Sequence, residues 1–516
     1  MNRKILWVDD EIDLLKGHII FLEKKGYELI PVTNGPDAIS LVQSQTFDAV
    51  LLDEMMPGMD GLHVLQEVNA IDPGLPVVMI TKSEEEHIMD DALGSRISDY
   101  LTKPVNPSQI FTTLKRLFDR DQLRGERISR EYARQSAQNN LSIGMGLDHQ
   151  GWGVLFENLC RWDLEIEQYN DAALMQMHHD QKKEARRVFC KFVENSYRSW
   201  IGGAAGPLLS HQIMDAYLTP RLRKGEKVYF VVIDCFRLDH WLAIEPKLDK
   251  LFRIERDRYY SILPSATPFS RNALFAGMLP SQIAVRHPDI WQNGGHDEVG
   301  MNRYERELQG DYLKRNNVEF RKEPVFQKIL TTDDAQAFLK RMRQFGDTQL
   351  VTMVYNFIDL LSHERSTNDI LMEIVPNEAA FRSLTRAWFE HSVLYEIFSA
   401  IAAEGATLVV TTDHGSIMAE KSSMVRGDRT TSDNVRYKYG RNLKCDPSAV
   451  LLVDRPEAYG LPSVGHGTNY LLAKDEHYLV YQNNFRQYEK LYQNTFQHGG
   501  ISMEEMILPI AVLTPR

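Results

Sequence analysis

The sequence has little cysteine and no long hydrophobic segment. Only four of its 516 residues are cysteines, and none of them fall in C-x-x-C spacing. This usage is typical of reduced thiols in a cytosolic protein and excludes a disulfide-stapled fold. The longest apolar runs, such as 228–233, have the length of a strand, whereas a membrane-spanning helix needs ~20 apolar residues. The opening stretch MNRKILWVDD lacks the apolar core of a signal peptide, so we expect a cytoplasmic protein without membrane insertion.

Motifs that read nucleic-acid bases are missing as well. We find no helix-turn-helix or zinc-finger pattern, and the formal net charge is −12, from 59 basic and 71 acidic residues. Both observations argue against a DNA-binding transcription factor. What remains is an ordinary globular composition, 43% hydrophobic and 25% charged. At ~150 residues per domain, the length predicts about three domains.

The first 120 residues alternate short apolar runs with segments of helical periodicity. The helical pattern is clear at 11–25, where apolar residues recur at i, i+3 and i+4. This alternation predicts a doubly wound parallel sheet with its functional site at the carboxyl ends of the strands. The expected strands are 3–8, 27–32, 47–52, 76–80 and 97–101.

Three acidic residues stand at these strand ends. Asp9 and Asp10 follow the first strand, and Asp53 closes the third. Carboxylates brought together in this way repel one another unless a hard cation lies among them, and Mg²⁺ with oxygen ligands fits that role. Thr81 at the end of the fourth strand offers a hydroxyl, and Lys103 after the fifth offers a cation, to an anion arriving at Asp53.

Two motifs in this region carry a resemblance to a known family. DEMMPGMDG at 53–61 and YLTKP at 100–104 are similar to the motifs of the receiver domain of bacterial two-component response regulators, a flavodoxin-like fold. The resemblance implies that a sensor histidine kinase transfers a phosphoryl group to the carboxylate of Asp53. It also implies Mg²⁺ ligands from Asp9, Asp10, Asp53 and the Met55 carbonyl, and switch residues Thr81, Tyr100 and Lys103.

Residues 121–205 contain no convincing strand. They show helical spacing with many charges, broken near 144–151. We predict a helical bundle or spacer here, between domains at 1–120 and 206–516. The pair His178 and His179 lacks a further ligand at i+4, so we expect a solvated helix face there rather than a metal site.

A second α/β pattern starts at residue 227. Apolar strand candidates alternate with helical stretches such as 380–403, and the length suits one large α/β domain with inserted loops. The expected strands are 228–233, 349–355, 406–411, 449–453 and 507–513.

Acids joined by histidines follow these strands. The second strand leads into NFIDLLSH, whose D-x-x-x-H spacing puts both side chains on one face of a helix. Carboxylate with imidazole suits Zn²⁺ or Mn²⁺, and these groups are too many for one tetrahedral ion. We therefore predict two ions about 4 Å apart, an arrangement suited to phosphoryl displacement. The candidate ligands are Asp234, Asp359, His363, Asp413, His414 and His498.

A nucleophile for such a site could come from PSATPFSRNALFAG at 264–277. Thr267 stands just before a proline and a helical run. One interpretation is plain helix capping, with Thr267 as N-cap and Pro268 at the first helical position. The other interpretation keeps that geometry and makes Thr267 a nucleophile. A hydroxyl at a helix N-terminus faces unpaired amides, which bind phosphate. When a metal activates this hydroxyl, it can attack the phosphorus.

The motifs VIDCFRLD, SATPFSR, IDLLSH, TTDHG and HGGIS together resemble the alkaline phosphatase superfamily, specifically its PglZ branch, over residues 206–516. The resemblance implies that Thr267 is the nucleophile and that Arg237 and Arg271 hold substrate oxygens. It favours His498 over His466 as a ligand, because HGG-x-S before a terminal strand is the superfamily's pattern; His466 would line the substrate pocket. The implied metal sets are Asp359, His363 and His498 for one ion, and Asp234, Thr267, Asp413 and His414 for the other.

A loop-like stretch at 420–444 carries seven basic and three acidic residues. It is either a solvated loop or a contact for the phosphate backbone of a nucleotide or oligonucleotide near the metal site.

The order of receiver, helical spacer and PglZ domain resembles that of the PorX-type response regulators of Bacteroidota, which are linked to type IX secretion. The resemblance implies a phosphorylation-promoted homodimer whose output domain is a dinuclear-metal phosphodiesterase for nucleotide or oligonucleotide substrates. An alternative from another class is a partner-binding module, for instance for a sigma factor, in which the metals are structural.

Overall fold

The computed structural model divides into two compact units, Met1–Glu131 and Tyr132–Arg516. None of the helices in the described part of the chain is long and apolar enough to cross a bilayer. The three-domain division stays a prediction. The residues that the structure describes are 3–82, 97–169, 171–293, 302–366, 368–427, 434–463, 465–483 and 485–516, without the side chains of 119–126 and 291–293.

The first unit is built on a five-stranded sheet in the order β2-β1-β3-β4-β5. All neighbouring strands are parallel, which confirms the predicted flavodoxin-like sheet. The carboxyl ends of β1 and β3, which are neighbours, therefore meet at one edge. The strands are β1 (Arg3–Val8), β2 (Tyr27–Val32), β3 (Ala49–Asp53), β4 (Val77–Thr81) and β5 (Asp99–Thr102).

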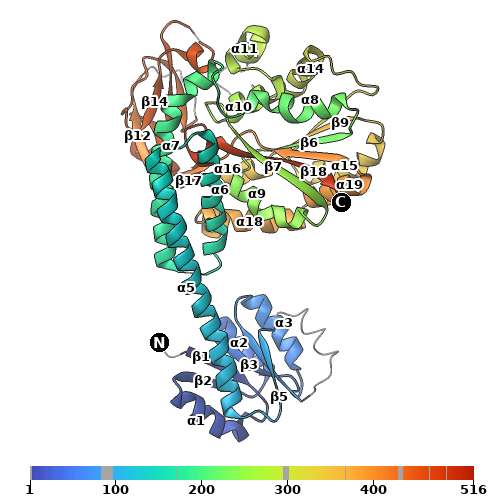
Figure 1. The fold of residues 1–516 in the computed structure, drawn as a ribbon, viewed down its shortest axis with the longest axis vertical. Helices are drawn as coiled ribbons and strands as arrows, with labels where there is room; N and C mark the ends of the chain where they lie inside the picture. The colour runs from blue at the N-terminus through green and yellow to red at the C-terminus, as the bar shows by residue number, and fades with distance from the viewer. Residues whose placement is uncertain are drawn as a thin grey trace. The chain divides into compact units, whose positions relative to one another are not determined.

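Helices cover both faces of this sheet (Figure 1). One core layer holds Ala38 of α2 and Val64 of α3, and the other holds Leu22 of α1 and Ile110 of α5. Apolar residues on both sides explain why the strands are continuous hydrophobic runs. The helices are α1 (Lys16–Lys24), α2 (Gly35–Ser44), α3 (Gly61–Ile71) and α5 (Pro107–Met145).

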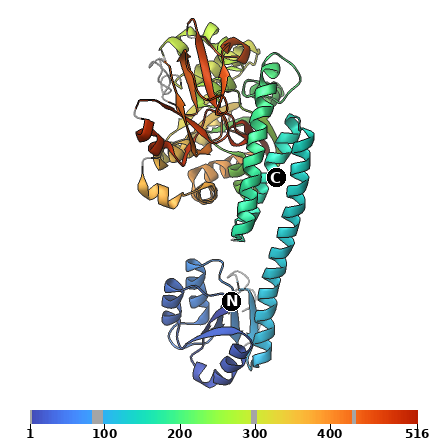
Figure 2. The ribbon, with the colours of Figure 1, turned by 90° about the vertical axis from the view of Figure 1, so that its left-hand side faces the viewer.

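The stretch after the receiver is helical, as predicted. Helix α5 ends at Met145, α6 spans His149–Ile166, and α7 spans Ala172–Ile201. The last two share an aromatic core with the C-terminal sheet, because Trp152 packs on Phe189 and Trp200 packs on Tyr260 of β7. Figure 2 shows α7, in green, alongside the C-terminal α/β part.

The C-terminal part is built on a six-stranded sheet in the order β7-β18-β10-β6-β9-β8. Only β18 runs antiparallel to its neighbours, so the ends of β6, β9 and β10 point to the same edge. This mixed α/β sheet confirms the predicted fold class. The strands are β6 (Val228–Ile233), β7 (Phe252–Tyr260), β8 (Val325–Ile329), β9 (Leu350–Tyr355), β10 (Thr407–Thr411) and β18 (Ile507–Pro515).

Helices again lie on both faces of the sheet. Figure 1 shows α10 and α14 on one face, and α9 and α18 on the other. The longer helices are α9 (Leu238–Leu248), α10 (Thr267–Ala276), α14 (Glu305–Arg315), α15 (Thr332–Arg341), α16 (Phe357–Arg365), α18 (Glu378–His391) and α19 (Val393–Glu404). The shorter ones are α8 (Thr219–Arg223), α11 (Pro280–Arg286), α12 (Pro288–Asn293), α17 (Asp369–Ile374), α20 (Phe485–Tyr492) and α21 (Met503–Met506).

Three small sheets complete the unit, and they correct two expectations. The expected strand 449–453 forms as β14, but it pairs with β15 in a separate three-stranded sheet. The stretch 420–444 is not simply a loop, because β12 and β13 lie within it. The additional strands are β11 (Ile417–Ala419), β12 (Lys421–Val425), β13 (Tyr437–Arg441), β14 (Val450–Val453), β15 (Thr468–Ala473), β16 (His477–Tyr481) and β17 (Thr495–Gln497).

Buried ion pairs join α7 to the C-terminal part. Lys182 Nζ lies 2.9 Å from carboxylate oxygens of both Asp163 on α6 and Glu378 on α18. Arg186, one turn later, lies 2.9 Å from Glu504. The face of α7 that carries the two histidines is partly buried too: His178 lies 3.1 Å from Asp163, so the expected solvated face is wrong there.

The Lys182 ion pairs provide a stability prediction. Lys182→Met should leave the buried Asp163 and the partly buried Glu378 short of a counter-charge and lower the free energy of unfolding by about 3 kcal/mol. Lys183→Met is the matched control. Lys183 is one-third exposed and pairs with Glu420 and with the buried Glu476. Because Glu476 keeps Arg186 and Lys421 as partners, the loss of Lys183 should cost less than about 1 kcal/mol. Urea unfolding of both variants measures the difference, and equal midpoints would contradict a structural role for the buried pairs.

Candidate functional site

The first candidate site lies at the ends of β1 and β3. One carboxylate oxygen each from Asp9, Asp10 and Asp53 lies within 4.8 Å of the others. Lys103 Nζ lies 3.1 Å from Asp9 Oδ2 and 2.9 Å from Asp53 Oδ2. Asp9 and Asp53 are buried, while Asp10 is exposed. The structure therefore brings together the predicted phosphorylation site, the acidic Mg²⁺ ligands and the lysine.

Burial controls the charge of this cluster. It raises the pKa of Asp53, an effect that Lys103 opposes and that Asp9 and Asp10 reinforce. Burial would lower the pKa of Lys103, but its hydrogen bonds to Asp53 and Asp9 raise it overall. Three carboxylates against one ammonium leave negative charge that a hard divalent cation fits.

The other receiver residues lie at the same edge. Thr81 ends β4 and is buried, Tyr100 on β5 packs against the core of the unit, and the Met55 side chain is exposed. Gly61 is required by close packing, because a Cβ there would lie 2.2 Å from the Asp53 carbonyl oxygen. This contact explains the glycine that ends the 53–61 motif.

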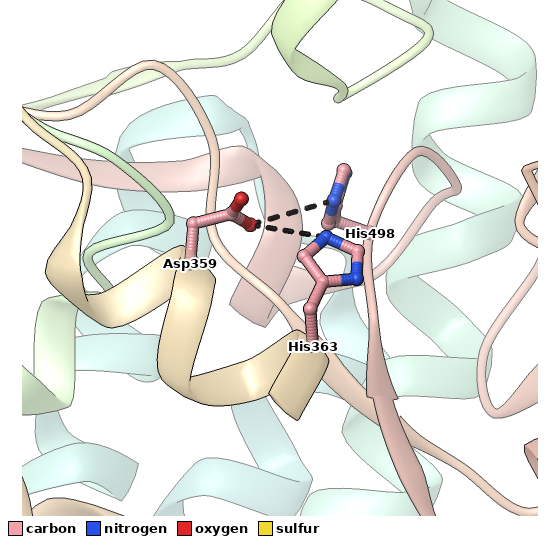
Figure 3. Close-up of side chains that lie close together, drawn as sticks. All are labelled: Asp359, His363 and His498. Atoms are coloured by element: carbon pink, nitrogen blue, oxygen red, sulfur yellow. Dashed lines mark ion pairs between the residues drawn. The ribbon is translucent and has the colours of Figure 1, made fainter. Parts of the chain in front are cut away.

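The second cluster joins α16 to the segment after β17. Asp359 and His363 lie one turn apart on α16, as their spacing predicted, and His498 follows β17. Asp359 Oδ1 lies 3.5 Å from His363 Nε2 and 3.7 Å from His498 Nε2 (Figure 3). The His363 side chain is 55% exposed, so this cluster is open to solvent.

The third cluster forms where β6 and β10 end. Asp234 follows β6, and Asp413 and His414 follow β10. His414 Nε2 lies 3.6 Å from Asp234 Oδ1 and 3.6 Å from Asp413 Oδ2. His414 Nδ1 lies 3.1 Å from the Gly415 carbonyl oxygen, which can only accept, so Nδ1 carries the proton and Nε2 presents its lone pair to the cluster.

Thr267 lies against this third cluster. Its hydroxyl donates to His414 Nε2 over 2.8 Å. Thr267 is the first residue of α10, the N-cap is Ala266, and no side chain caps the helix. The expectation that Thr267 is the N-cap and Pro268 the first helical residue is therefore wrong. The hydroxyl is directed at the candidate metal ligands instead.

The two clusters of the C-terminal unit are adjacent. The rings of His414 and His498 stack with centroids 4.2 Å apart. Asp234 Oδ1, Asp359 Oδ1 and His498 Nδ1 are buried without a hydrogen-bond partner. Leaving such an atom unpaired costs about 1–3 kcal/mol, so this is a poor arrangement for the protein alone and a suitable one for cations. The donor sets fit two divalent ions: Asp359, His363 and His498 for one, and Asp234, Asp413, His414 and the Thr267 hydroxyl for the other.

The electrostatics agree with that fit. Burial raises the pKa of Asp234 well above its usual value, Arg271 opposes this shift, and Asp413 adds to it. Burial, with the neighbouring His414, holds the pKa of His498 well below its usual value. A bound cation would favour the ionised carboxylate and the neutral imidazole, which are the forms that coordinate metals.

Arg271, predicted to hold substrate, lies among the candidate ligands. It contacts Asp234, and its Nε lies 2.9 Å from Asp413 Oδ2. Two further neighbours were missed in the sequence analysis. Asn356 Nδ2 donates to Asp234 Oδ2 over 2.9 Å, and the buried Glu305 lies 3.7 Å from Arg271. Only Asn356 had a signal, its place at the end of β9 just before the D-x-x-x-H motif.

The other predicted substrate contacts lie apart from the ligands. Arg237 is 1% exposed, and its guanidinium pairs with Asp239 and Glu378. His466 is exposed in the turn before β15 and belongs to none of the potential metal clusters among the described residues. Substrate contacts by Arg237 and His466 stay predictions, whereas His498 lies with the other ligands.

The basic stretch 420–444 is only partly exposed. Arg436 is buried and pairs with Glu505, and Lys438 is buried over the Tyr481 ring. Residues 428–433 lie outside the described part of the chain. The proposed contact with a phosphate backbone therefore stays a prediction, to which these two basic side chains contribute little.

Three protein families match successive parts of the chain. Residues 5–115 match the response regulator receiver domain, residues 122–201 the PorX response regulator linker domain, and residues 213–513 the BREX system PglZ alkaline phosphatase-like domain.

Two individual relatives match about a quarter of this chain. The chain is 32% identical over 125 residues to the alkaline phosphatase synthesis transcriptional regulatory protein PhoP of Bacillus subtilis (strain 168), covering 24% of this chain and 51% of that one. It is 32% identical over 115 residues to the regulatory protein VanRc of Enterococcus gallinarum, covering 22% and 49%. The chain thus spans about half the length of these relatives. A solved receiver domain from Methanospirillum hungatei JF-1 is 26% identical and covers 23% of this chain and 96% of that one, with a TM-score of 0.23.

The match to the PglZ domain covers more than half of the 516 residues, and the receiver and linker precede it in order. The chain therefore belongs to the PglZ alkaline phosphatase-like family and has the domain architecture of the PorX-type response regulators.

Proposed function

We propose that this protein is a phosphorylation-controlled phosphohydrolase. Its receiver takes a phosphoryl group on Asp53 from a sensor histidine kinase, with Mg²⁺ among Asp9, Asp10 and Asp53. Its PglZ domain is a phosphodiesterase with two Zn²⁺ or Mn²⁺ ions that acts on nucleotide or oligonucleotide substrates. In the cell it would be a cytoplasmic regulator of type IX secretion, acting as a phosphorylation-promoted homodimer.

The observation that carries this proposal is the convergence at the edge of the C-terminal sheet. Residues from five separate segments meet there as two adjacent clusters, and a hydroxyl lies 2.8 Å from a ligand nitrogen. A pure partner-binding module has no need of a hydroxyl in that place. Dinuclear clusters of this kind stabilise both the attacking and the leaving oxygen of a phosphoryl displacement.

The residues of the site have separate roles in the proposed reaction. Thr267 Oγ1, held by His414 at the start of α10, would attack phosphorus, forming a threonyl phosphate as the bond to the leaving oxygen breaks; water would then hydrolyse that ester. At the start of α10, Pro268 has no amide hydrogen, and the amides of Phe269 and Ser270 donate to the Ala266 carbonyl oxygen, so the Thr267 amide is the one that would bind a phosphoryl oxygen. Divalent ions held by the two clusters would supply Lewis-acid stabilisation of the developing charge.

The ion pairs of α7 offer a route for control of the PglZ domain. Lys182 on α7 holds Glu378, and Glu378 lies 3.1 Å from Arg237, three residues beyond Asp234. Arg237 also donates to the Ser416 carbonyl oxygen, just after the Asp413 segment. A shift of α7 would therefore reach the backbone of both ligand-bearing segments, with a coupling of about 1–3 kcal/mol, typical of allosteric proteins.

The metal sites can be tested without any substrate. Elemental analysis of the full chain should find two tightly bound Zn²⁺ or Mn²⁺ ions, and His498→Ala should lose one because it removes a ligand. His466→Ala is the matched control and should keep both, since His466 lies in no cluster. Loss of an ion in His466→Ala, with two retained in His498→Ala, would reverse the ligand assignment.

Hydrolysis of bis-p-nitrophenyl phosphate tests the nucleophile. Thr267→Ala should lower kcat by about 10³-fold or more, because it removes the hydroxyl on which the covalent ester forms. Thr267→Ser keeps a hydroxyl and should retain measurable turnover. Activity in Thr267→Ala equal to that of the wild type would remove Thr267 as nucleophile. A chain that binds its ions but hydrolyses no phosphate ester would favour the partner-binding alternative.

The receiver is tested by phosphorylation with acetyl phosphate. The wild type should gain one phosphoryl group by intact mass and elute as a larger species in size exclusion, whereas Asp53→Asn should do neither. Asp60→Asn is the control from the same loop: Asp60 caps α3 through its side chain, and Asn caps equally well. An identical response in Asp53→Asn would show that phosphorylation occurs elsewhere.

A further inference from the structure

A buried arginine bridges two carboxylates behind the third cluster. Arg271 lies one turn after Thr267 on α10, and its side chain is 2% exposed. Its Nε lies 2.9 Å from Asp413 Oδ2, and its Nη2 contacts Asp234 Oδ2. One planar group therefore fixes two ligands that come from the neighbouring strands β6 and β10.

The bridge leaves a particular oxygen of Asp234 for the site. Oδ2 is engaged by Arg271 and also accepts from Asn356 Nδ2 over 2.9 Å. Oδ1 has no hydrogen-bond partner and lies 3.6 Å from His414 Nε2. The donors behind the carboxylate thus fix its rotation with the unpaired oxygen toward the candidate ligand atoms.

Glu305 forms an ion pair with the same arginine. Glu305 is the first residue of α14 and is fully buried. Its Oε1 lies 3.7 Å from Arg271 Nη1, and its Oε2 lies 2.7 Å from Lys328 Nζ. Among the described residues, Glu305 forms its ion pairs with Arg271 and Lys328, and neither is a candidate metal ligand. Lys328, Glu305, Arg271 and the two aspartates form a chain of alternating charge that ends at the cluster.

We propose that Arg271 is a positioning residue for this half of the metal site and that Glu305 fixes Arg271. The inference rests on the proposed metal-dependent function and deepens it. A substrate contact, the role that the sequence suggested, needs donors directed at the substrate. The Nε of Arg271 instead hydrogen-bonds Asp413, and its Nη atoms form ion pairs with Asp234 and Glu305. If Arg271 acted only through its positive charge, its removal would strengthen metal binding, because a cation beside the site repels metal ions.

The affinity of each site for Zn²⁺, measured in the full chain by competition with a chromogenic chelator, separates these roles. Arg271→Lys keeps the charge but loses the planar fork, so one of the two ions should bind about 10–100-fold more weakly, as is typical when an outer partner of a ligand is lost. Glu305→Gln should weaken the binding of the same ion by about tenfold. The ion at Asp359 should be unchanged in both variants.

Arg286→Lys is the matched control. Arg286 forms a bidentate pair with Asp311 on the surface, and this variant should bind both ions as the wild type does. If Arg271→Lys folds poorly, as judged by near-UV circular dichroism, Glu305→Gln carries the test, and wild-type affinity in it would overturn the proposal.

The other outcomes are distinct. Wild-type affinity in Arg271→Lys, with a raised KM for bis-p-nitrophenyl phosphate, would make Arg271 a substrate contact. Tighter Zn²⁺ binding in Arg271→Met would show that Arg271 acts only through its positive charge. Absence of tight ions from the wild type would contradict the proposed function itself, whereas tight ions unaffected by the Arg271 and Glu305 variants would contradict only the positioning role.

Discussion

Buried carboxylates that meet at the end of a sheet repel one another, and both candidate sites of this protein are arranged around that repulsion. In the receiver, Lys103 lies between Asp9 and Asp53. In the C-terminal unit, Arg271 lies between Asp234 and Asp413. In each case one basic side chain bridges two acids from neighbouring parallel strands. The basic side chain reduces the repulsion between the acids, but each site keeps an excess of negative charge. That excess suits each site to divalent metals.

The two bridging side chains differ in their freedom to move. Lys103 is a flexible ammonium and is one-fifth exposed, so it can follow an anion that arrives at Asp53. Arg271 is a planar guanidinium, buried between three carboxylates, and has no comparable freedom. A receiver must change its contacts when it is phosphorylated, whereas a hydrolase needs fixed ligands. The choice of lysine in one site and arginine in the other agrees with these proposed roles.

Much of this could be predicted from the sequence, since strands buried on both faces are continuous apolar runs and their last residues are easy to find. The predicted ligands therefore meet as expected. The 252–260 strand β7 was missed because four consecutive charged residues, 255–258, interrupt its apolar pattern. The strand β14 was assigned to the wrong sheet because an apolar run does not specify its partner. The buried partners were missed for another reason. Arg271 and Glu305 are 34 positions apart, and Lys182 and Glu378 are 196 apart, so no local pattern links them.

The same buried pairs limit how a signal could reach the PglZ domain. Opening the contacts of one buried cation, for example those of Lys182 with Asp163 and Glu378, leaves that charge unpaired and costs about 3–5 kcal/mol. Allosteric coupling usually supplies only about 1–3 kcal/mol. A phosphorylated receiver therefore has too little free energy to open these contacts one at a time. It would have to displace α7 together with Glu378 and Arg237 as one body, so the Asp234 and Asp413 segments would move with the helix while their own contacts stay intact.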